Sequence, residues 1–261
     1  MLQDDLPAAT VDAVAALLQT ARRILFITGA GMSADSGLPT YRGIGGLYER
    51  KDTDEGFPIE VALSGRMLQS RPEVCWKYIA QIGAACVGAR HNRGHEILAA
   101  IERAIPDTWV LTQNVDGFHR DAGSRQVIEI HGNARSIVCT RCSRRDTVSD
   151  YHALALPPMC PACGHVLRPE VVLFGEILPP EATEAYERET RLGFDLVVSI
   201  GTTSVFPYIA APVIEAHEQG IPTVEINPGD SEVSRFVDHR IRSRAAVALQ
   251  ALWQRFAASR A

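Results

Sequence analysis

Short apolar runs alternate with amphipathic stretches along most of this chain. The first apolar run spans 24–28, and four more lie at 109–112, 127–130, 196–200 and 223–226. Helical periodicity predicts helices at 10–22, 72–88, 94–104, 181–191, 207–219 and 245–257. Apolar runs of this length are typical of parallel strands covered on both faces. Their alternation with helices predicts an α/β fold, a doubly wound, Rossmann-like parallel sheet.

A polar turn follows each predicted strand. These turns span 29–33, 113–117, 131–133, 201–204 and 227–229. Because the ligands of a doubly wound sheet bind beyond the carboxyl ends of its strands, we expect these five turns to converge on one site. Residues 42–60, rich in glycine and charge, are predicted to form a loop.

Composition narrows the choice of partners. The chain has 261 residues with 26 Lys+Arg against 31 Asp+Glu, a formal net charge of −5, so it lacks the bulk basic field that direct nucleic-acid binding uses. No apolar run approaches the roughly 18 residues of a membrane span, which predicts no membrane partner. The amino-terminal residues carry acid where a targeting peptide carries Arg or Lys, and this predicts a cytoplasmic protein. The sequence does not indicate an oligomeric state.

Four of the six cysteines form two Cys-x-x-Cys pairs. They are Cys139, Cys142, Cys160 and Cys163, and 17 residues separate the pairs. This spacing is typical of a four-thiolate zinc site, and two disulfides are the alternative. A chain without an export signal disfavours disulfides. Four thiolates leave no open position for a substrate, so we expect one structural zinc that stabilises roughly 136–170.

Two turns carry groups suited to a dinucleotide. Gly29 and Gly31 after the first strand suit a backbone that approaches a pyrophosphate closely, although a tight turn without ligand has the same glycines. The third glycine of the usual fingerprint is replaced by Ala34, and no acidic strand end follows within about 20 residues, which disfavours a hydride-transferring dehydrogenase. Gln113, Asn114 and Asp116 can bind a carboxamide and a ribose, or can simply cap a polar turn.

His131 follows the third predicted strand. Its unperturbed pKa lies near 6.5, which suits a general base at neutral pH, whereas a lone histidine is more often structural.

Six ordered segments resemble the motifs of the sirtuins, the NAD-dependent protein deacylases. They are the opening 29–42, the segments 112–119 and 129–133, the paired cysteines with 167–176, and the turns 200–203 and 225–227. The resemblance covers about 24–245. It implies a Rossmann-like NAD-binding domain made of 1–41, 91–135 and 171–261, and an inserted small domain with helices and zinc made of 42–90 and 136–170.

The resemblance also implies site residues. Catalysis would rest on His131 and Asn114. Contacts to NAD would come from Gly29, Ala30, Gly31, Ser33, Asp35, Tyr41, Arg42, Gln113, Asn114, Asp116, Gly201, Thr202, Thr203, Asn227 and Arg244. The acyl-lysine of a protein or peptide would lie against Val172, Phe174 and Gly175, with Tyr78 near the acyl end.

The reaction implied by the resemblance consumes NAD. The acyl oxygen attacks the ribose C1′, nicotinamide leaves, and His131 deprotonates the ribose hydroxyls so that one of them attacks the imidate carbon. The products are free lysine, nicotinamide and O-acyl-ADP-ribose. Two alternatives stay open: an ADP-ribosyl transferase, which has less need of a base such as His131, and an NAD-binding sensor without turnover.

Three residues depart from the family pattern. Tyr41 replaces the usual Phe, and Pro207 comes one position early, which changes the turn after Gly201. The branch that removes acidic acyl groups carries Tyr-x-x-Arg, whereas here Gln81 follows Tyr78 at that spacing. No guanidinium is then placed to pair with an acidic acyl group, which favours a deacetylase, although residues 43–46 resemble the loop of the acidic-acyl branch.

Overall fold

The computed structural model describes residues 4–40, 53–148 and 150–259, so the predicted contacts of Tyr41 and Arg42 lie outside the described residues. Its larger part is a six-stranded sheet, ordered β3-β2-β1-β7-β8-β9, in which every pair is parallel. The strands are β1 (Arg23–Thr28), β2 (Asp107–Thr112), β3 (Val127–Glu129), β7 (Leu196–Ile200), β8 (Thr223–Ile226) and β9 (His239–Ile241). This confirms the predicted doubly wound sheet.

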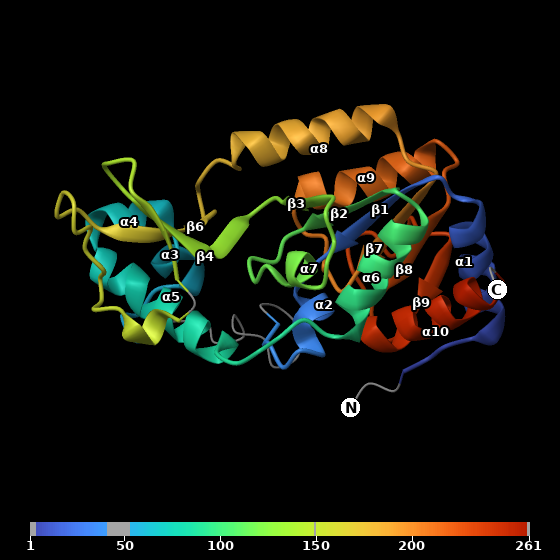
Figure 1. Ribbon diagram of the computed structural model, residues 1–261, viewed down its shortest axis with the longest axis horizontal. Coiled ribbons are helices and arrows are strands. Elements are labelled where there is room, and N and C mark those ends of the chain that lie inside the picture. The colour runs from blue at the N-terminus through green and yellow to red at the C-terminus, as the bar shows by residue number, and fades with distance from the viewer. Residues whose placement is uncertain (1–3, 41–52, 149, 260–261) are drawn as a thin grey trace.

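Alternate residues of β1 supply two different cores. Ile24 and Phe26 pack with helices α1 (Ala8–Thr20), α6 (Arg93–Ala104) and α10 (Ala245–Ala258) on one face. Leu25 and Ile27 pack with α8 (Pro180–Leu192) and α9 (Pro207–Glu218) on the other. Figure 1 shows these two helix layers on either side of the strands. Because both faces are covered, the central strands β1 and β7 are buried along nearly their whole length.

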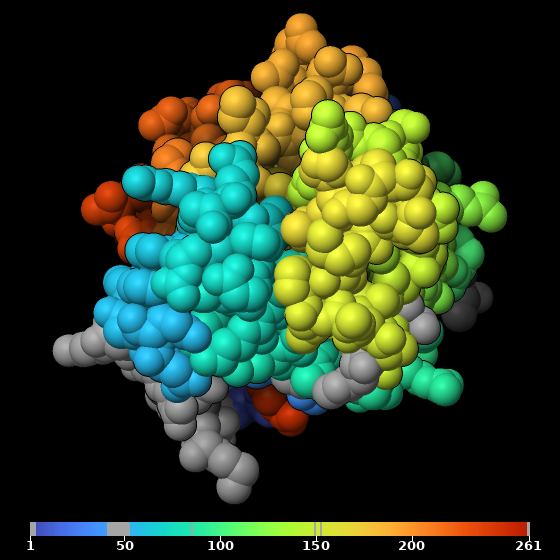
Figure 2. All heavy atoms as spheres, turned by 90° about the vertical axis from the view of Figure 1, so that its left-hand side faces the viewer, coloured from blue at the N-terminus to red at the C-terminus, as the bar shows by residue number. Residues whose placement is uncertain are grey.

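A second, smaller module lies at one end of the molecule (Figure 1). It contains an antiparallel sheet ordered β5-β4-β6, made of β4 (Gly132–Cys139), β5 (Arg145–Thr147) and β6 (Leu167–Val171). Helices α3 (Ile59–Ala62), α4 (Gly65–Ser70) and α5 (Pro72–Cys86) pack beside it, as Figure 2 shows from that end. Within this module, buried Trp76 links helix α5 to the sheet, because its indole N–H donates a 2.8 Å hydrogen bond to the Leu167 carbonyl in β6.

The long elements match the sequence-based prediction to within two residues at each end. The prediction missed the short ones, which include β4, β5, β6, β9 and α4, together with α2 (Ala30–Ala34), α7 (Phe118–Asp121) and η2 (Tyr151–Ala153). The domain boundaries stay a prediction. Two of them, after residues 135 and 170, fall within β4 and β6, the strands that lead into and out of the cysteine-containing segment.

Candidate active site and metal centre

A cavity of about 1180 Å³ lies at the carboxyl ends of the sheet strands, between the sheet and the small module. The turns after β1, β2, β7 and β8 line it from one side, and α5, Pro169 and residues 171–176 line it from the other. The predicted site residues that line it are Gly29, Ala30, Gly31, Ser33, Gln113, Asn114, Asp116, His131, Val172, Phe174, Gly175, Gly201, Thr202, Thr203, Asn227 and Arg244. Asp35 and Tyr78 are not among them.

Gly29 and Gly31, which follow β1, have no room for a side chain because the turn at Gly201 and Thr202 packs against them. Gly31 N–H donates a 2.8 Å hydrogen bond to the Gly201 carbonyl. A β-carbon on Gly31 would lie 2.7 Å from the Gly201 α-carbon, and one on Gly29 would lie 2.7 Å from the Thr202 β-carbon. Gly201 itself has a positive φ of 58°. The two turns therefore pack so closely that they form a floor in which Gly29 and Gly31 have no room for a side chain.

Buried polar groups join the ends of β1 and β2. Asn114 is 5% exposed, and its Nδ2 donates to the Gly29 carbonyl at 2.9 Å and to Ser33 Oγ at 3.2 Å. The Ser33 hydroxyl donates to Asp116 Oδ2 at 2.7 Å, and the Phe118 N–H donates to Asp116 Oδ1 at 2.9 Å. Burial raises the pKa of Asp116, while these two hydrogen bonds oppose that shift.

His131 is held at both ring nitrogens. Nδ1 lies 3.1 Å from the Gln113 carbonyl oxygen, which only accepts, so Nδ1 carries the proton. Nε2 lies 2.7 Å from the Tyr208 hydroxyl and is left as an acceptor. Burial lowers the pKa of His131. The imidazole is therefore neutral at neutral pH, with a basic nitrogen at the cavity.

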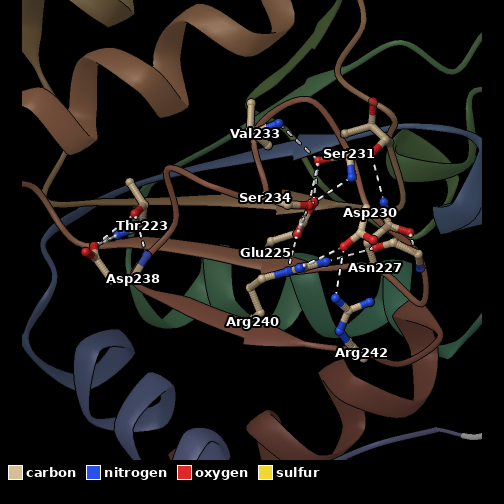
Figure 3. A network of polar contacts seen from close by, with 12 residues as sticks. Thr223, Glu225, Asn227, Asp230, Ser231, Val233, Ser234, Asp238, Arg240 and Arg242 are labelled. Atoms are coloured by element: carbon tan, nitrogen blue, oxygen red, sulfur yellow. Dashed lines mark hydrogen bonds and ion pairs between the residues drawn. The ribbon is translucent and has the colours of Figure 1, made fainter.

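The turns after β7 and β8 are tied to each other. Gln113 Nε2 donates to Thr202 Oγ1, and Asn227 Nδ2 donates to the Thr202 carbonyl, both at 2.8 Å. Beneath Asn227, the carboxylate of Glu225, a residue only 1% exposed, accepts from the Ser231 and Ser234 hydroxyls and pairs with Arg240 (Figure 3). The prediction missed this support because its partners lie in an irregular segment and in the short strand β9, which was not predicted.

Asp35 does not line the cavity but binds Arg244, which does. Its Oδ1 lies 3.0 Å from Arg244 Nη1, and its Oδ2 accepts from the Ala246 N–H. Arg244 also pairs with Asp4. The acidic residue of the glycine-rich motif therefore orients an arginine at the start of α10.

The segment 172–176 is fixed by hydrogen bonds along one side. Val172 N–H donates to the His131 carbonyl at 2.9 Å, and Phe174 exchanges backbone bonds with Leu63 and Gly65. Glu176 accepts from Arg168 Nη2 at 2.8 Å and from the Leu173 N–H at 2.9 Å. This segment forms the cavity wall of the small module.

Tyr78 lies away from the cavity wall formed by its neighbours Ile79 and Ile82. Its hydroxyl donates to the Glu55 carboxylate, which Lys77 also binds, at 2.9 Å. Tyr78 is not among the residues that line the cavity, and its placement at the acyl end stays a prediction. A residue next to a wall-forming position on a helix points in another direction, because successive residues are about 100° apart.

The four paired cysteines form one cluster. Their sulfur atoms all lie within 4.8 Å of one another, and the Sγ–Sγ separations are 3.4 Å for Cys139–Cys163 and 3.7 Å for Cys142–Cys160. A disulfide would require about 2.05 Å, whereas a tetrahedron with metal–sulfur bonds of about 2.3 Å requires separations near those observed. The Cys142 N–H points at Cys139 Sγ and lowers the pKa of Cys139 to about 6. The cluster fits a structural zinc ion.

Within the described ranges, no helix has the length and apolarity needed to cross a membrane.

Three features define the sirtuin class of NAD-dependent proteins. They are a doubly wound sheet, a glycine-lined site that carries amides and a neutral histidine, and an appended four-cysteine module. Residues 29–207 match the model of the Sir2 family, and the chain belongs to this family.

Relatives and solved structures agree. The chain is 52% identical over 242 residues to the NAD-dependent protein deacylase 2 of Pseudomonas aeruginosa, covering 92% of this chain and 93% of that protein. The structure of a Sir2 homologue in complex with NAD superposes with a TM-score of 0.84 at 32% identity, covering 96% of this chain and 95% of the other. A Sir2 complex with a p53 peptide and NAD+ gives a TM-score of 0.79 at 27% identity, covering 93% and 96%.

Proposed function

We propose that this chain is an NAD-dependent protein lysine deacylase in which His131 is the general base. One observation carries the proposal: the unprotonated Nε2 of His131 lies in a cavity bounded by the glycine floor on one side and by the strand-like segment 172–176 on the other. The chain belongs to the Sir2 family, and two relatives that are 52% identical to it are named NAD-dependent protein deacylases.

NAD would be held by the floor and the turns around it. The backbone of Gly29, Ala30 and Gly31 leaves room for a pyrophosphate. Asn114, Asp116 and Ser33 would present an amide, a carboxyl and a hydroxyl group to a nicotinamide carboxamide and its ribose. Gly201, Thr202, Thr203, Asn227 and Arg244 would face the adenosine end, with Asp35 orienting Arg244. When bound, NAD supplies an electrophilic ribose carbon and nicotinamide as its leaving group.

His131 supplies the proton acceptor. Its Nδ1–H is committed to the Gln113 carbonyl, so Nε2 is the nitrogen that would take a proton from a ribose hydroxyl, once that hydroxyl replaces the Tyr208 hydroxyl there. Because burial lowers the pKa of His131, the base is unprotonated at neutral pH. Asn114 is positioned by Gly29 and Ser33 and would orient the reacting ribose.

The charges at the cavity favour a neutral acyl group. Among the described lining residues, the arginines are Arg135 and Arg244. Arg135 forms a bidentate pair with Asp121, at 2.8 and 2.6 Å, and Arg244 is paired with Asp4 and Asp35. The wall formed by Ile79 and Ile82 is apolar. An acidic acyl group would therefore meet no unpaired guanidinium on the described wall, which supports deacetylation.

Acyl-lysine proteins or peptides would be the partners, bound as an added strand along Val172, Phe174 and Gly175. Recognition through the backbone demands little of the flanking side chains. Nucleic acids and membranes are not proposed as partners, in keeping with the acidic balance, and we propose a cytoplasmic location. The zinc would hold the cysteine-containing segment that continues through β6 into the substrate wall.

Mass spectrometry of one peptide tests the proposal. The peptide carries acetyl-, succinyl- or lauroyl-lysine and is incubated with and without NAD, beside His131→Ala. We expect NAD-dependent loss of acetyl with O-acetyl-ADP-ribose as co-product, faster than loss of succinyl, and none of it in the variant. NAD consumption without deacylation would instead indicate ADP-ribosyl transfer or hydrolysis. An unchanged rate in His131→Ala would refute the role of the base.

A further inference from the structure

A carboxylate is buried within an inner strand of the six-stranded sheet. Glu225 is 1% exposed and stands between Val224 and Ile226 in β8, a strand whose four residues are all buried. A charge removed from water destabilises a fold strongly unless other groups compensate for the lost hydration. Glu225 is not among the residues that line the cavity. Any effect of this carboxylate on a ligand must therefore pass through its neighbours.

Both oxygens of this carboxylate have partners (Figure 3). The Ser231 hydroxyl donates to Oε1, and the Ser234 hydroxyl donates to Oε2 at 2.7 Å. Arg240 Nε lies 2.8 Å from Oε2, and Arg240 stands opposite Glu225 in the register of β8 with β9. All three partners follow β8 in the chain. The carboxylate therefore ties the segment between β8 and β9 back to the sheet.

Arg240 also binds the part of this segment that faces the cavity. Its Nη2 donates to the Gly229 carbonyl at 3.1 Å, and its Nη1 lies 2.9 Å from Asp230 Oδ1. Gly229 and Asp230 both line the cavity, as do Asn227 and Pro228 before them. One guanidinium group therefore connects the buried carboxylate to the turn that these four residues form.

We propose that Glu225 is a positioning residue for NAD, which holds the turn 227–230 in place for the adenosine end through Arg240 and the two serines. The proposal rests on the proposed function, which assigns the adenosine end to Asn227 and the turns beside it. A turn that is ordered only on binding costs affinity, because its conformational entropy is lost at that moment. A turn fixed beforehand avoids this cost. The carboxylate thus contributes to affinity without touching the ligand.

Glu225→Ala removes the acceptor that Ser231, Ser234 and Arg240 share. We expect calorimetry to show that ADP-ribose, which carries the adenosine end of NAD, binds on the order of tenfold more weakly. With NAD at saturation, kcat and the KM for an acetylated peptide should be unchanged, because the peptide does not contact that end of the site. Glu225→Gln keeps the shape of the side chain and one acceptor oxygen, so its loss of affinity should be smaller.

Hydrogen–deuterium exchange detects the same effect before any ligand is added. In NAD-free Glu225→Ala, the amides of 227–234 should exchange faster than in the unmodified protein, because the segment is no longer tied to the sheet. The amides of β1 should keep their rate. Unchanged exchange over 227–234 would contradict the proposal.

Glu189→Ala is the matched control. Glu189 lies on α8, is 6% exposed, and pairs with Arg23 at 3.1 Å and with Arg188 at 2.8 Å. Arg23 begins β1, so this buried carboxylate lies at the end of the strands that is opposite to the cavity. We expect chemical denaturation to show that Glu189→Ala is destabilised like Glu225→Ala, while its affinity for ADP-ribose stays that of the unmodified protein.

The outcomes separate this role from a merely structural one and from the proposed function. The role of Glu225 is overturned if both of its variants bind ADP-ribose normally, or if Glu189→Ala loses as much affinity. If Glu225→Ala does not fold, Glu225→Gln decides the test. An unmodified protein that binds ADP-ribose but removes no acyl group contradicts the proposed function and leaves this comparison valid. An unmodified protein that does not bind ADP-ribose overturns the role of Glu225.

Discussion

The Ser33 hydroxyl donates a 2.7 Å hydrogen bond to Asp116, so the ends of β1 and β2 share one buried carboxylate. Asp116→Asn replaces one of its two acceptor oxygens by an amide that faces a donor, either Ser33 O–H or Phe118 N–H. An unmatched buried donor costs about 1–3 kcal/mol. We expect NAD affinity to fall by about tenfold or more, measured by calorimetry. Asp107→Asn, at an exposed carboxylate, should bind NAD normally; equal affinity in both variants would contradict this.

The close approach of Gly31 to Gly201 predicts a steric effect. A β-carbon at Gly31 would meet backbone atoms, which cannot rotate away as a side chain does. We expect Gly31→Ala to lower the free energy of unfolding by roughly 1–3 kcal/mol and to weaken NAD binding. Gly229 also lines the cavity, but a β-carbon there meets no atom within 4 Å, so Gly229→Ala is the control. Chemical denaturation that ranks the two variants equally would disprove the argument.

Local patterns predicted the sheet and the metal ligands, whereas longer-range relationships were not predictable. The apolar runs and the two cysteine pairs are local signals: the parallel sheet is confirmed, and the four cysteines lie close enough together to hold a metal ion. The pairing of Ser33 with Asp116 joins residues 83 positions apart, and that of Tyr208 with His131 joins residues 77 apart. No local pattern specifies such contacts. The position of Tyr78 outside the cavity lining illustrates a related limit: a motif gives the position on a helix, and the packing of α5 decides which side chains form the wall.

Removal of a zinc ligand should disturb the small module. Cys142→Ser leaves three thiolates, and between β4 and β6 the buried members of the hydrophobic cluster are Tyr151 and the zinc-site cysteine Cys160. We expect loss of bound zinc, measured by atomic absorption, together with faster proteolysis within 140–165 and loss of activity. Cys86→Ser, at a cysteine outside the cluster, should retain full zinc. A Cys142→Ser protein that stays fully active without zinc would be inconsistent with this role.

The ion pair of Glu176 with Arg168 predicts a selective defect in peptide binding. Glu176 accepts from Arg168 and from the Leu173 N–H and so shapes the substrate wall. Glu176→Gln breaks the bidentate geometry, and we expect the peptide KM to rise several-fold while the KM for NAD stays constant, measured by steady-state kinetics. Glu170→Gln removes a more exposed pair with Arg145 and should alter neither constant. A matching rise in the KM for NAD would count against the assignment.

Two buried histidines predict an acid-sensitive fold. Burial lowers the pKa of His95 to about 4 and that of His119 well below its usual range, whereas both titrate near 6.5 when the chain is unfolded. Between about pH 6.5 and 4 the unfolded state therefore binds more protons, so the free energy of unfolding must decrease as the pH falls through this window.

His95→Gln isolates one of these groups. Gln can still accept the hydrogen bond that the Asn92 N–H donates at the start of α6, but it does not titrate. Each unit of pKa difference is equivalent to about 1.4 kcal/mol, so we expect a flatter dependence of unfolding free energy on pH by a few kcal/mol across the window. Urea denaturation at pH 7, 6 and 5 measures this slope. His217→Gln, on the surface of α9, should keep the slope of the unmodified protein, and an unchanged slope in His95→Gln would show that His95 is not a source of the acid sensitivity.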